Sequence, residues 1–151
     1  MKRLLCFGFL IFQVALPAQQ DREGEIRSSI DRFFEGFHAR DTNRIKTVLF
    51  DTVLLQTIGR GPDGKAALRT EPMGNFLKSI AGIPDSVAIE ERLLDYKIRI
   101  DGNMAHAWTP YEFYLRGEFS HCGVNSFQLF RGESGWKIIY IVDTRRREGC
   151  N

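Results

Sequence analysis

One histidine stands among acidic and amide residues in the C-terminal third of the chain in a way that could support proton transfer. His121 lies on one expected strand, Asp143 and Arg145 lie at the end of the next, and Glu112 lies on the strand before. A histidine beside a carboxylate is the smallest unit for general acid–base catalysis, and a nearby arginine would keep that carboxylate charged. Asn125 falls opposite Asp143 in the expected pairing. The same group could instead be a hydrogen-bonded corner that holds the strands together.

No motif in the sequence predicts a metal or a cofactor. The segment Gly59 to Lys65 nearly spells a phosphate-binding loop, but Ala66 replaces the hydroxyl residue that would bind magnesium, and Pro62 lacks a backbone donor. The three cysteines lack the spacing of zinc ligands. We therefore expect neither a cofactor nor a metal.

The elements that must position these residues follow from hydrophobic periodicity. Ile26, Ile30 and Phe33 mark one face of a helix over about residues 23–40. A short helix after Asp41, a strand over 53–58, a loop over 59–72 and a third helix over 73–80 come next. Four long strands follow, over residues 87–100, 104–115, 119–131 and 136–144. Three helices followed by an antiparallel sheet predict an α+β fold with the helices on one sheet face.

The start of the chain resembles a secretory signal peptide. The chain has 151 residues, and its first three carry two positive charges before an apolar run that ends at Leu16. We expect cleavage after Ala18, which gives a signal peptide over 1–18, a single domain over 19–151 and a periplasmic or secreted location. Removing Lys2 and Arg3 leaves 19 of the 21 basic residues against 19 acidic ones. Such a neutral chain lacks the charge that nucleic acids attract, and we expect no membrane span in it.

The order of these elements resembles the nuclear-transport-factor-2-like (NTF2-like) superfamily. The last strand begins Gly135-Trp136-Lys137, and the segments from Ser120 to Phe127 and from Asp143 to Arg146 resemble secreted members grouped as ketosteroid-isomerase-like or lumazine-binding-type proteins. The resemblance covers nearly the whole expected mature chain. It implies a cone in which a curved antiparallel sheet wraps the N-terminal helix around an apolar pocket, often in a dimer.

Strand alternation predicts which residues face that pocket. Tight turns set Ile98 opposite Ala105, Tyr111 opposite Val124, and Gln128 opposite Tyr140. The face that results carries no charge and should pack against the helices. Its polar tips should line the cavity: Tyr96, Thr109, Tyr111, Ser126, Gln128 and Tyr140.

The same alternation places the candidate catalytic residues on the outer face. A bulge at Gly123 would turn His121 inward, and one at Pro110 would turn Glu112 and Tyr114 inward. The outer face also collects an apolar patch of Phe127, Leu129, Ile139 and Ile141 beside Trp108. Such a patch favours a homodimer interface, although long side chains of the same face could cover it.

The two cysteines of the expected mature chain are predicted to be free thiols. The register pairs Cys122 with about Arg146, so that Cys150 would lie about 13 Å further along a straight strand, beyond disulfide reach. A tail that curls back at Gly149 would remove this distance.

These observations favour an exported domain that binds a small apolar or aromatic molecule. Its expected ligand-binding residues are Tyr96, Tyr111, His121, Ser126, Gln128, Tyr140, Asp143 and Arg145. One alternative is a lyase or isomerase of the ketosteroid-isomerase-like type that uses His121 with Asp143 or Glu112. Another is an interaction module whose cone is filled by Phe33, Phe37 and Trp136. An acid or histidine that points into an open pocket favours the enzyme.

The signal-peptide interpretation predicts that the exported protein begins at Gln19. Intact-mass spectrometry of material recovered outside the cytoplasm should give the mass of residues 19–151. A retained Met1 in that material would contradict the prediction.

Overall fold

The computed structural model describes residues 15–150, which form three helices and one seven-stranded sheet. Most of the expected signal peptide, residues 1–14, lies outside these residues. The elements in chain order are α1 (Ala15–Ala39), α2 (Thr42–Lys46), β1 (Leu49–Arg60), β2 (Ala66–Pro72), α3 (Met73–Ala81), β3 (Ile89–Leu93), β4 (Lys97–Asp101), β5 (Met104–Leu115), β6 (Glu118–Gly132) and β7 (Gly135–Thr144). None of the described helices is long and apolar enough to cross a membrane.

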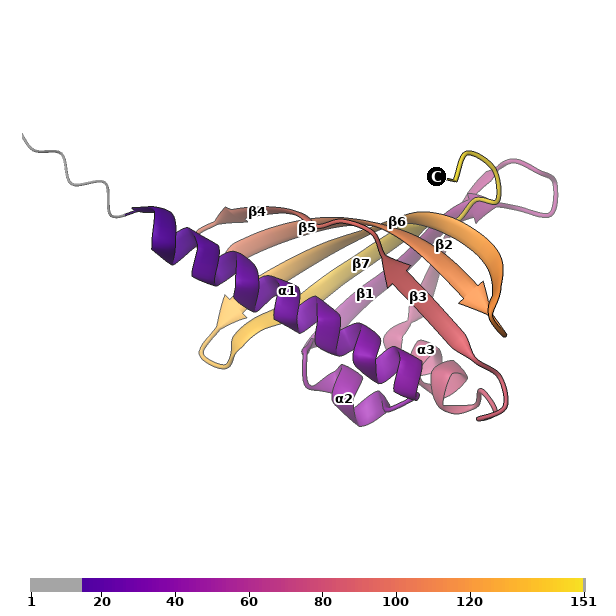
Figure 1. The fold of residues 1–151 in the computed structure, drawn as a ribbon, viewed down its shortest axis with the longest axis horizontal. Helices are drawn as coiled ribbons and strands as arrows, with labels where there is room; N and C mark the ends of the chain where they lie inside the picture. Colours follow the sequence, from indigo (N-terminus) through magenta and orange to yellow (C-terminus); the bar gives the residue numbers. More distant parts are fainter. Residues whose placement is uncertain (1–14, 151) are drawn as a thin grey trace, which may run out of the picture.

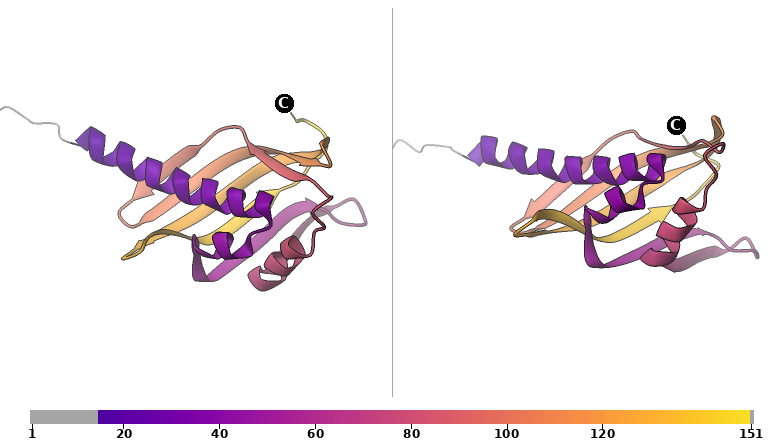
Figure 2. Two further views of the ribbon diagram at one scale, coloured as in Figure 1. Left: turned by 60° about the horizontal axis from the view of Figure 1, so that its bottom comes forward. Right: turned by 90° about the horizontal axis from the view of Figure 1, so that it is seen from below.

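The sheet is curved, and the helices cover its concave face (Figures 1 and 2). Its strand order is β2-β1-β7-β6-β5-β3, with β4 also paired to β5. All pairs are antiparallel except β1 with β7. The α+β prediction with helices on one face is therefore confirmed.

The long helix α1 supplies most of the helix side of the core. Its residues at i, i+4 and i+7 are buried at Ile26, Ile30 and Phe33, which is the spacing of one helix face. They pack against inward residues of the sheet such as Phe127 and Leu129, both of which are fully buried. Asp41 caps α2 by accepting hydrogen bonds from the backbone N–H groups of the first turn.

Two expected elements differ from the sequence prediction. The loop expected over residues 59–72 is wrong, because Ala66–Pro72 forms β2 in a hairpin with β1. The single strand expected over 87–100 is divided into β3 and β4. The division falls beside Pro110 of β5, whose nitrogen carries no hydrogen to donate to an edge strand.

The predicted register between β5 and β6 is wrong by one residue. The turn uses Arg116 and Gly117, both with positive φ, and Ser120 is an extra residue, so that Tyr111 pairs with Gly123 and not with Val124. A shift of one residue turns every side chain of β6 to the other face. Phe127 and Leu129 are therefore core residues and not the expected outer patch.

Gly123 permits an unusually close approach of neighbouring strands. An added Cβ at this position would lie 1.7 Å from the carbonyl oxygen of Thr144 and 2.8 Å from the ring of Tyr111. No side chain fits there. A bulge at Gly123, considered above as one way to turn His121 inward, is absent from the β5–β6 pairing, and this residue instead lets the Tyr111 ring lie over β6.

The cysteines are joined, which corrects the expectation of free thiols. Cys122 and Cys150 form a disulfide with a Cα–Cα distance of 5.9 Å. The expected pairing of Cys122 with Arg146 is confirmed as an isolated bridge. Beyond it the tail does not run straight, since Gly149 adopts a φ of 64° and brings Cys150 back.

Candidate functional site

An apolar pocket with a polar rim lies between α1, α3 and the concave face of the sheet. Its volume is about 290 Å³. Aromatic side chains of α1, α3 and β5 form much of its wall, namely Phe33, Phe34, Phe37, Phe76 and Phe113. Its polar residues are Glu71, Ser79, Glu91, His121, Asn125, Asp143 and Arg145. Pockets that are mostly apolar with a few converging polar groups are typical small-molecule sites.

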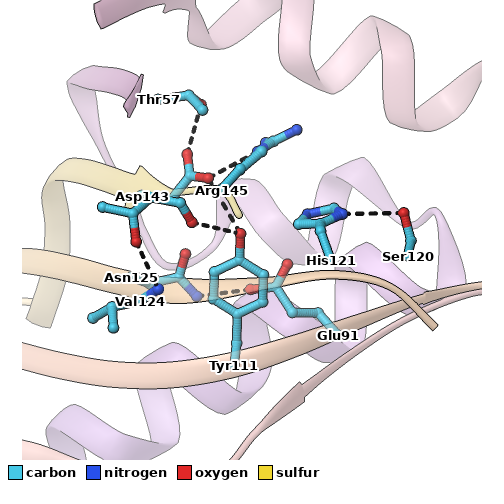
Figure 3. A network of polar contacts seen from close by, with 10 residues as sticks. Thr57, Glu91, Tyr111, Ser120, His121, Val124, Asn125, Asp143 and Arg145 are labelled. Carbon is cyan, nitrogen blue, oxygen red and sulfur yellow. Dashed lines mark hydrogen bonds and ion pairs between the residues drawn. The ribbon is translucent and has the colours of Figure 1, made fainter. Parts of the chain in front are cut away.

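Asp143, at the end of β7, is the centre of the polar network. Its buried carboxylate accepts hydrogen bonds from the Thr57 hydroxyl at 2.6 Å and from Nε of Arg145 at 2.8 Å (Figure 3). The Tyr111 hydroxyl lies 3.4 Å from the same carboxylate and donates to the carbonyl of Thr144 at 3.0 Å. Burial raises the pKa of Tyr111, which keeps the phenol protonated as a donor. Asp143 is thus held by three neighbours and is best suited to positioning them.

Glu91 of β3 brings a second carboxyl group into the pocket. It accepts a hydrogen bond from Nδ2 of Asn125 at 2.7 Å, while its backbone N–H donates to Nε2 of His38 at 2.9 Å. Burial raises the pKa of Glu91 to about 7, and the neighbouring Asp143 acts in the same direction. Asn125 and Arg145 only partly offset these two effects. Glu91 therefore changes its protonation state near neutral pH, as a general base or acid requires.

His121 of β6 faces the pocket but does not bond directly to Asp143. Its Nδ1 lies 3.1 Å from the Ser120 hydroxyl (Figure 3). Its ring stacks on Phe113 at a centroid distance of 4.9 Å. Burial lowers the pKa of His121, and the positive charge of Arg145 lowers it further. The imidazole is consequently neutral at physiological pH, with one ring nitrogen free of a hydrogen bond from the described residues.

The structure brings together some of the sequence-predicted site residues. His121, Asn125, Asp143 and Arg145 all line the pocket, and Asn125 pairs with Asp143 as predicted. His121 reaches the pocket through the one-residue shift of β6 and not through a bulge at Gly123. The four do not form one hydrogen-bonded group, because Asn125 bonds to Glu91 and His121 to Ser120.

Other predicted residues lie elsewhere. Ser126, Gln128 and Tyr140 are on the outer face, because the β6 register turns them away from the helices. There the Tyr140 hydroxyl donates to Gln56. Glu112 also lies away from the pocket, where it accepts a hydrogen bond from Tyr114 at 2.8 Å.

Tyr111, which is buried, does not line the pocket either, and the same holds for Tyr96. The hydroxyl of Tyr96 bonds to Asp31 of α1, and its ring lies beneath the guanidinium of Arg27, with 4.2 Å from Cζ to the ring centroid.

Sequence reasoning missed Glu91, although a signal for it was present. Ile89, Glu91 and Leu93 alternate on one side of β3, and the two apolar residues are buried or half-buried. An acid between two core positions of a strand is therefore expected to point inward.

A larger hollow of about 770 Å³ lies at the opposite end of α1, beside the β6–β7 turn. It is lined mainly by polar residues such as Ser28, Asn103 and Lys137 and contains none of the residues that line the apolar pocket. Within residues 15–150, no group of three or more histidine, cysteine or acidic side chains is arranged to hold a metal ion.

Comparison with solved structures gives many close matches of fold. An NTF2-like protein of unknown function from Shewanella baltica has a TM-score of 0.61 and 14% identity, over 89% of this chain and 99% of that one. A suggested dehydratase of the NTF2-like family from Streptomyces avermitilis has a TM-score of 0.64 and 16% identity, over 85% and 98% of the two chains. A protein of unknown function from Mycobacterium tuberculosis reaches 0.69 with 13% identity, over 89% and 78%.

This chain is an α+β protein whose curved sheet carries helices and an apolar pocket on its concave face (Figure 1). The chain has the fold of the NTF2-like superfamily. No family model and no curated protein matches its sequence. At these identities the likeness establishes the fold, and the activity must be argued from the pocket.

The raised pKa of Glu91 predicts a specific dependence of stability on pH. Between about pH 4.5 and 7 the folded state holds a proton on Glu91 that the unfolded state releases, so this residue lowers the free energy of unfolding as pH rises. Glu91→Gln should therefore stabilise the protein at pH 8 by about 3 kcal/mol and change little at pH 4.5. Urea denaturation at both pH values measures this difference.

The matched control is Glu90→Gln, which alters the exposed neighbouring acid on the same strand. It should not produce the same pH-dependent gain. Equal effects of Glu91→Gln at pH 4.5 and 8 would mean that the Glu91 carboxyl titrates as an ordinary surface acid.

Proposed function

We propose that this protein binds a small, largely apolar or aromatic molecule in the apolar pocket and catalyses proton transfer on it. The observation that carries this proposal is a carboxyl group with a pKa of about 7, that of Glu91, among aromatic side chains. A carboxylate whose pKa lies near the working pH is substantially ionised at that pH and is still basic enough to accept a proton from the substrate. The reaction class is isomerisation or elimination, because both begin with removal of a proton from carbon.

The proposed roles differ from the expected His121 with Asp143 or Glu112. Glu91 removes the substrate proton and then returns it or passes it to solvent. His121, neutral and on the same pocket wall, donates to or accepts from the polar group of the substrate where charge develops. Asp143 and Arg145 are positioning residues: they are bonded to each other, and Asp143 also contacts the hydroxyl of the buried Tyr111.

Binding without catalysis is the second candidate, and the same aromatic lining supports it. A cavity of about 150 Å³ holds benzene, so a pocket of about 290 Å³ has room for two fused rings. The third interpretation, a filled interaction module, has less support, since this open volume lies directly beside Phe33 and Phe37. Trp136 is buried and does not line this pocket.

The model substrate 5-nitrobenzisoxazole tests the catalytic proposal, because it is neutral, aromatic and of two fused rings. A base removes the proton on carbon 3, the N–O bond breaks, and the coloured phenolate nitrile forms without any co-reactant. We expect catalysis whose kcat/KM rises with pH through about 7. Glu91→Gln should lower kcat/KM at least tenfold, and His121→Ala should lower it less.

Glu112→Gln is the control, since it removes a carboxyl group that lies outside the pocket. It should retain the wild-type rate. Unchanged catalysis in Glu91→Gln would overturn the role of Glu91, whereas saturable binding of the substrate without turnover would leave the binding function alone standing.

Export is part of the proposal. Disulfides persist in the periplasm and outside cells and are rare in the reducing cytosol, so the Cys122–Cys150 bond supports an exported location. The signal-peptide pattern of residues 1–18 points to the same location.

We also propose a homodimer that uses the outer face of the sheet, with a composition different from the one expected from the sequence. Phe127, Leu129 and Ile141 are buried inside, but the strand alternation places other large apolar side chains on the outer face. These outer-face residues are Phe50, Leu54, Ile58, Leu68, Met104, Trp108 and Phe130. The exposed fraction of each lies between 39% and 60%. Exposed apolar area on this scale favours burial against a second copy.

Light scattering coupled to gel filtration should give about twice the mass of one chain. Trp108→Glu should shift the protein to the monomer mass, because it places a charge within the apolar outer face. Leu94→Glu is the control, as Leu94 is similarly exposed in the link between β3 and β4. A wild-type protein that is monomeric at millimolar concentration would contradict the proposal.

A further inference from the structure

A positively charged groove adjoins the apolar pocket at its open rim. It has a volume of about 720 Å³ and is formed by the end of the β1–β2 hairpin and the C-terminal tail. Five arginines line it, Arg60, Arg69, Arg145, Arg146 and Arg147, against a single acid, Glu148.

Most of this positive charge is not compensated by acidic side chains. Arg145 alone forms an ion pair, with Asp143 at 2.8 Å. Arg60 and Arg146 donate to the backbone carbonyls of Gly64 and Gly149, which carry no net charge. Within residues 15–150, the other four arginines make no ion pair. A concave surface lined by one sign of charge attracts ligands of the opposite sign.

The groove is held in shape by the fold. The Cys122–Cys150 disulfide and the bridge between Cys122 and Arg146 fix the tail on either side of Arg147. On the β1–β2 hairpin, Arg69 pairs with Thr57, whose side chain faces Asp143. The guanidinium of Arg69 lies close to Gly59. The hairpin and the tail are joined directly, because the backbone N–H of Arg145 donates to the carbonyl of Ile58 at 2.9 Å. The arginines are therefore carried by two anchored, neighbouring segments.

The groove and the apolar pocket adjoin each other, because His121 and Arg145 line both. A single ligand can thus place an apolar part in the pocket and a charged part in the groove. Guanidinium groups bind carboxylates and other planar oxyanions through paired hydrogen bonds, which favours such a group at this end of the ligand.

We infer that the ligand of this protein is a one- or two-ring apolar molecule that carries a carboxylate-type anionic group. Its rings occupy the pocket beside Glu91 and His121, and its anionic group lies among Arg69, Arg145 and Arg147. This inference rests on the proposed binding function and specifies its substrate class.

Isothermal titration calorimetry with 2-naphthoate and 2-naphthamide tests the inference, since the two compounds share their rings and differ in charge. At low ionic strength the wild-type protein should bind 2-naphthoate at least tenfold more tightly than 2-naphthamide. The difference should shrink as salt is raised, because added ions screen the groove. The double variant Arg69→Gln/Arg147→Gln should bring the ratio of the two Kd values close to one while leaving the Kd of 2-naphthamide unchanged.

The matched control is Arg32→Gln/Arg99→Gln, which removes the same charge from exposed positions on α1 and β4. It should retain the wild-type ratio. Equal binding of the two compounds by the wild-type protein, or a ratio that persists in the groove variant, would overturn the anionic ligand class while the pocket remains a binding site. Failure of both compounds to bind would count against the proposed function itself.

Discussion

The pairing of β5 with β6 is the constraint on which the rest of the structure depends. Because Tyr111 lies opposite Gly123, the Tyr111 ring covers a position where no side chain fits, and its hydroxyl reaches the end of β7. The same register directs Phe127 toward α1 and His121 toward the pocket. A slip by one residue would bury the outer-face residues and expose the core, so the core and the candidate site are fixed by one choice of register.

Two carboxyl groups share the pocket rim, and their surroundings give them different tasks. Asp143 has an arginine and two hydroxyl groups around it, so its charge is compensated where it is buried. Glu91 has one amide donor and lies close to Asp143, which makes its charged form costly. A carboxyl group whose surroundings move its pKa toward neutrality is a common basis for acid–base chemistry. Asp143 contributes to the raised pKa of Glu91, on which the proposed proton transfer depends.

Much of the fold was predictable from the sequence, because helix periodicity and strong turn signals are local. The three helices, the antiparallel order of β5 to β7 and the pairing of Asn125 with Asp143 follow from such signals. Which side chains of β6 point toward the helices was not predictable in the same way. One extra residue at Ser120 exchanges the inward and outward side chains, and nothing in the local sequence distinguishes the two registers. The ion pair of Asp143 with Arg145 was expected, but the role of Glu91 depends on burial that only the assembled fold creates.

The position of the site also follows from how the fold divides its surface. Along α1 the helices cover the concave face, and the core beneath them is apolar (Figure 1). The face is open near β3, the β1–β2 hairpin and the tail after β7 (Figure 1). These segments lie far apart in the chain, and they contribute Glu91, Arg69 and Arg147 to the linings of the pocket and the groove. At that opening an apolar interior meets a cationic rim over a short distance. A ligand that uses both must itself be apolar at one end and anionic at the other, because the pocket offers aromatic contacts and the groove offers guanidinium groups.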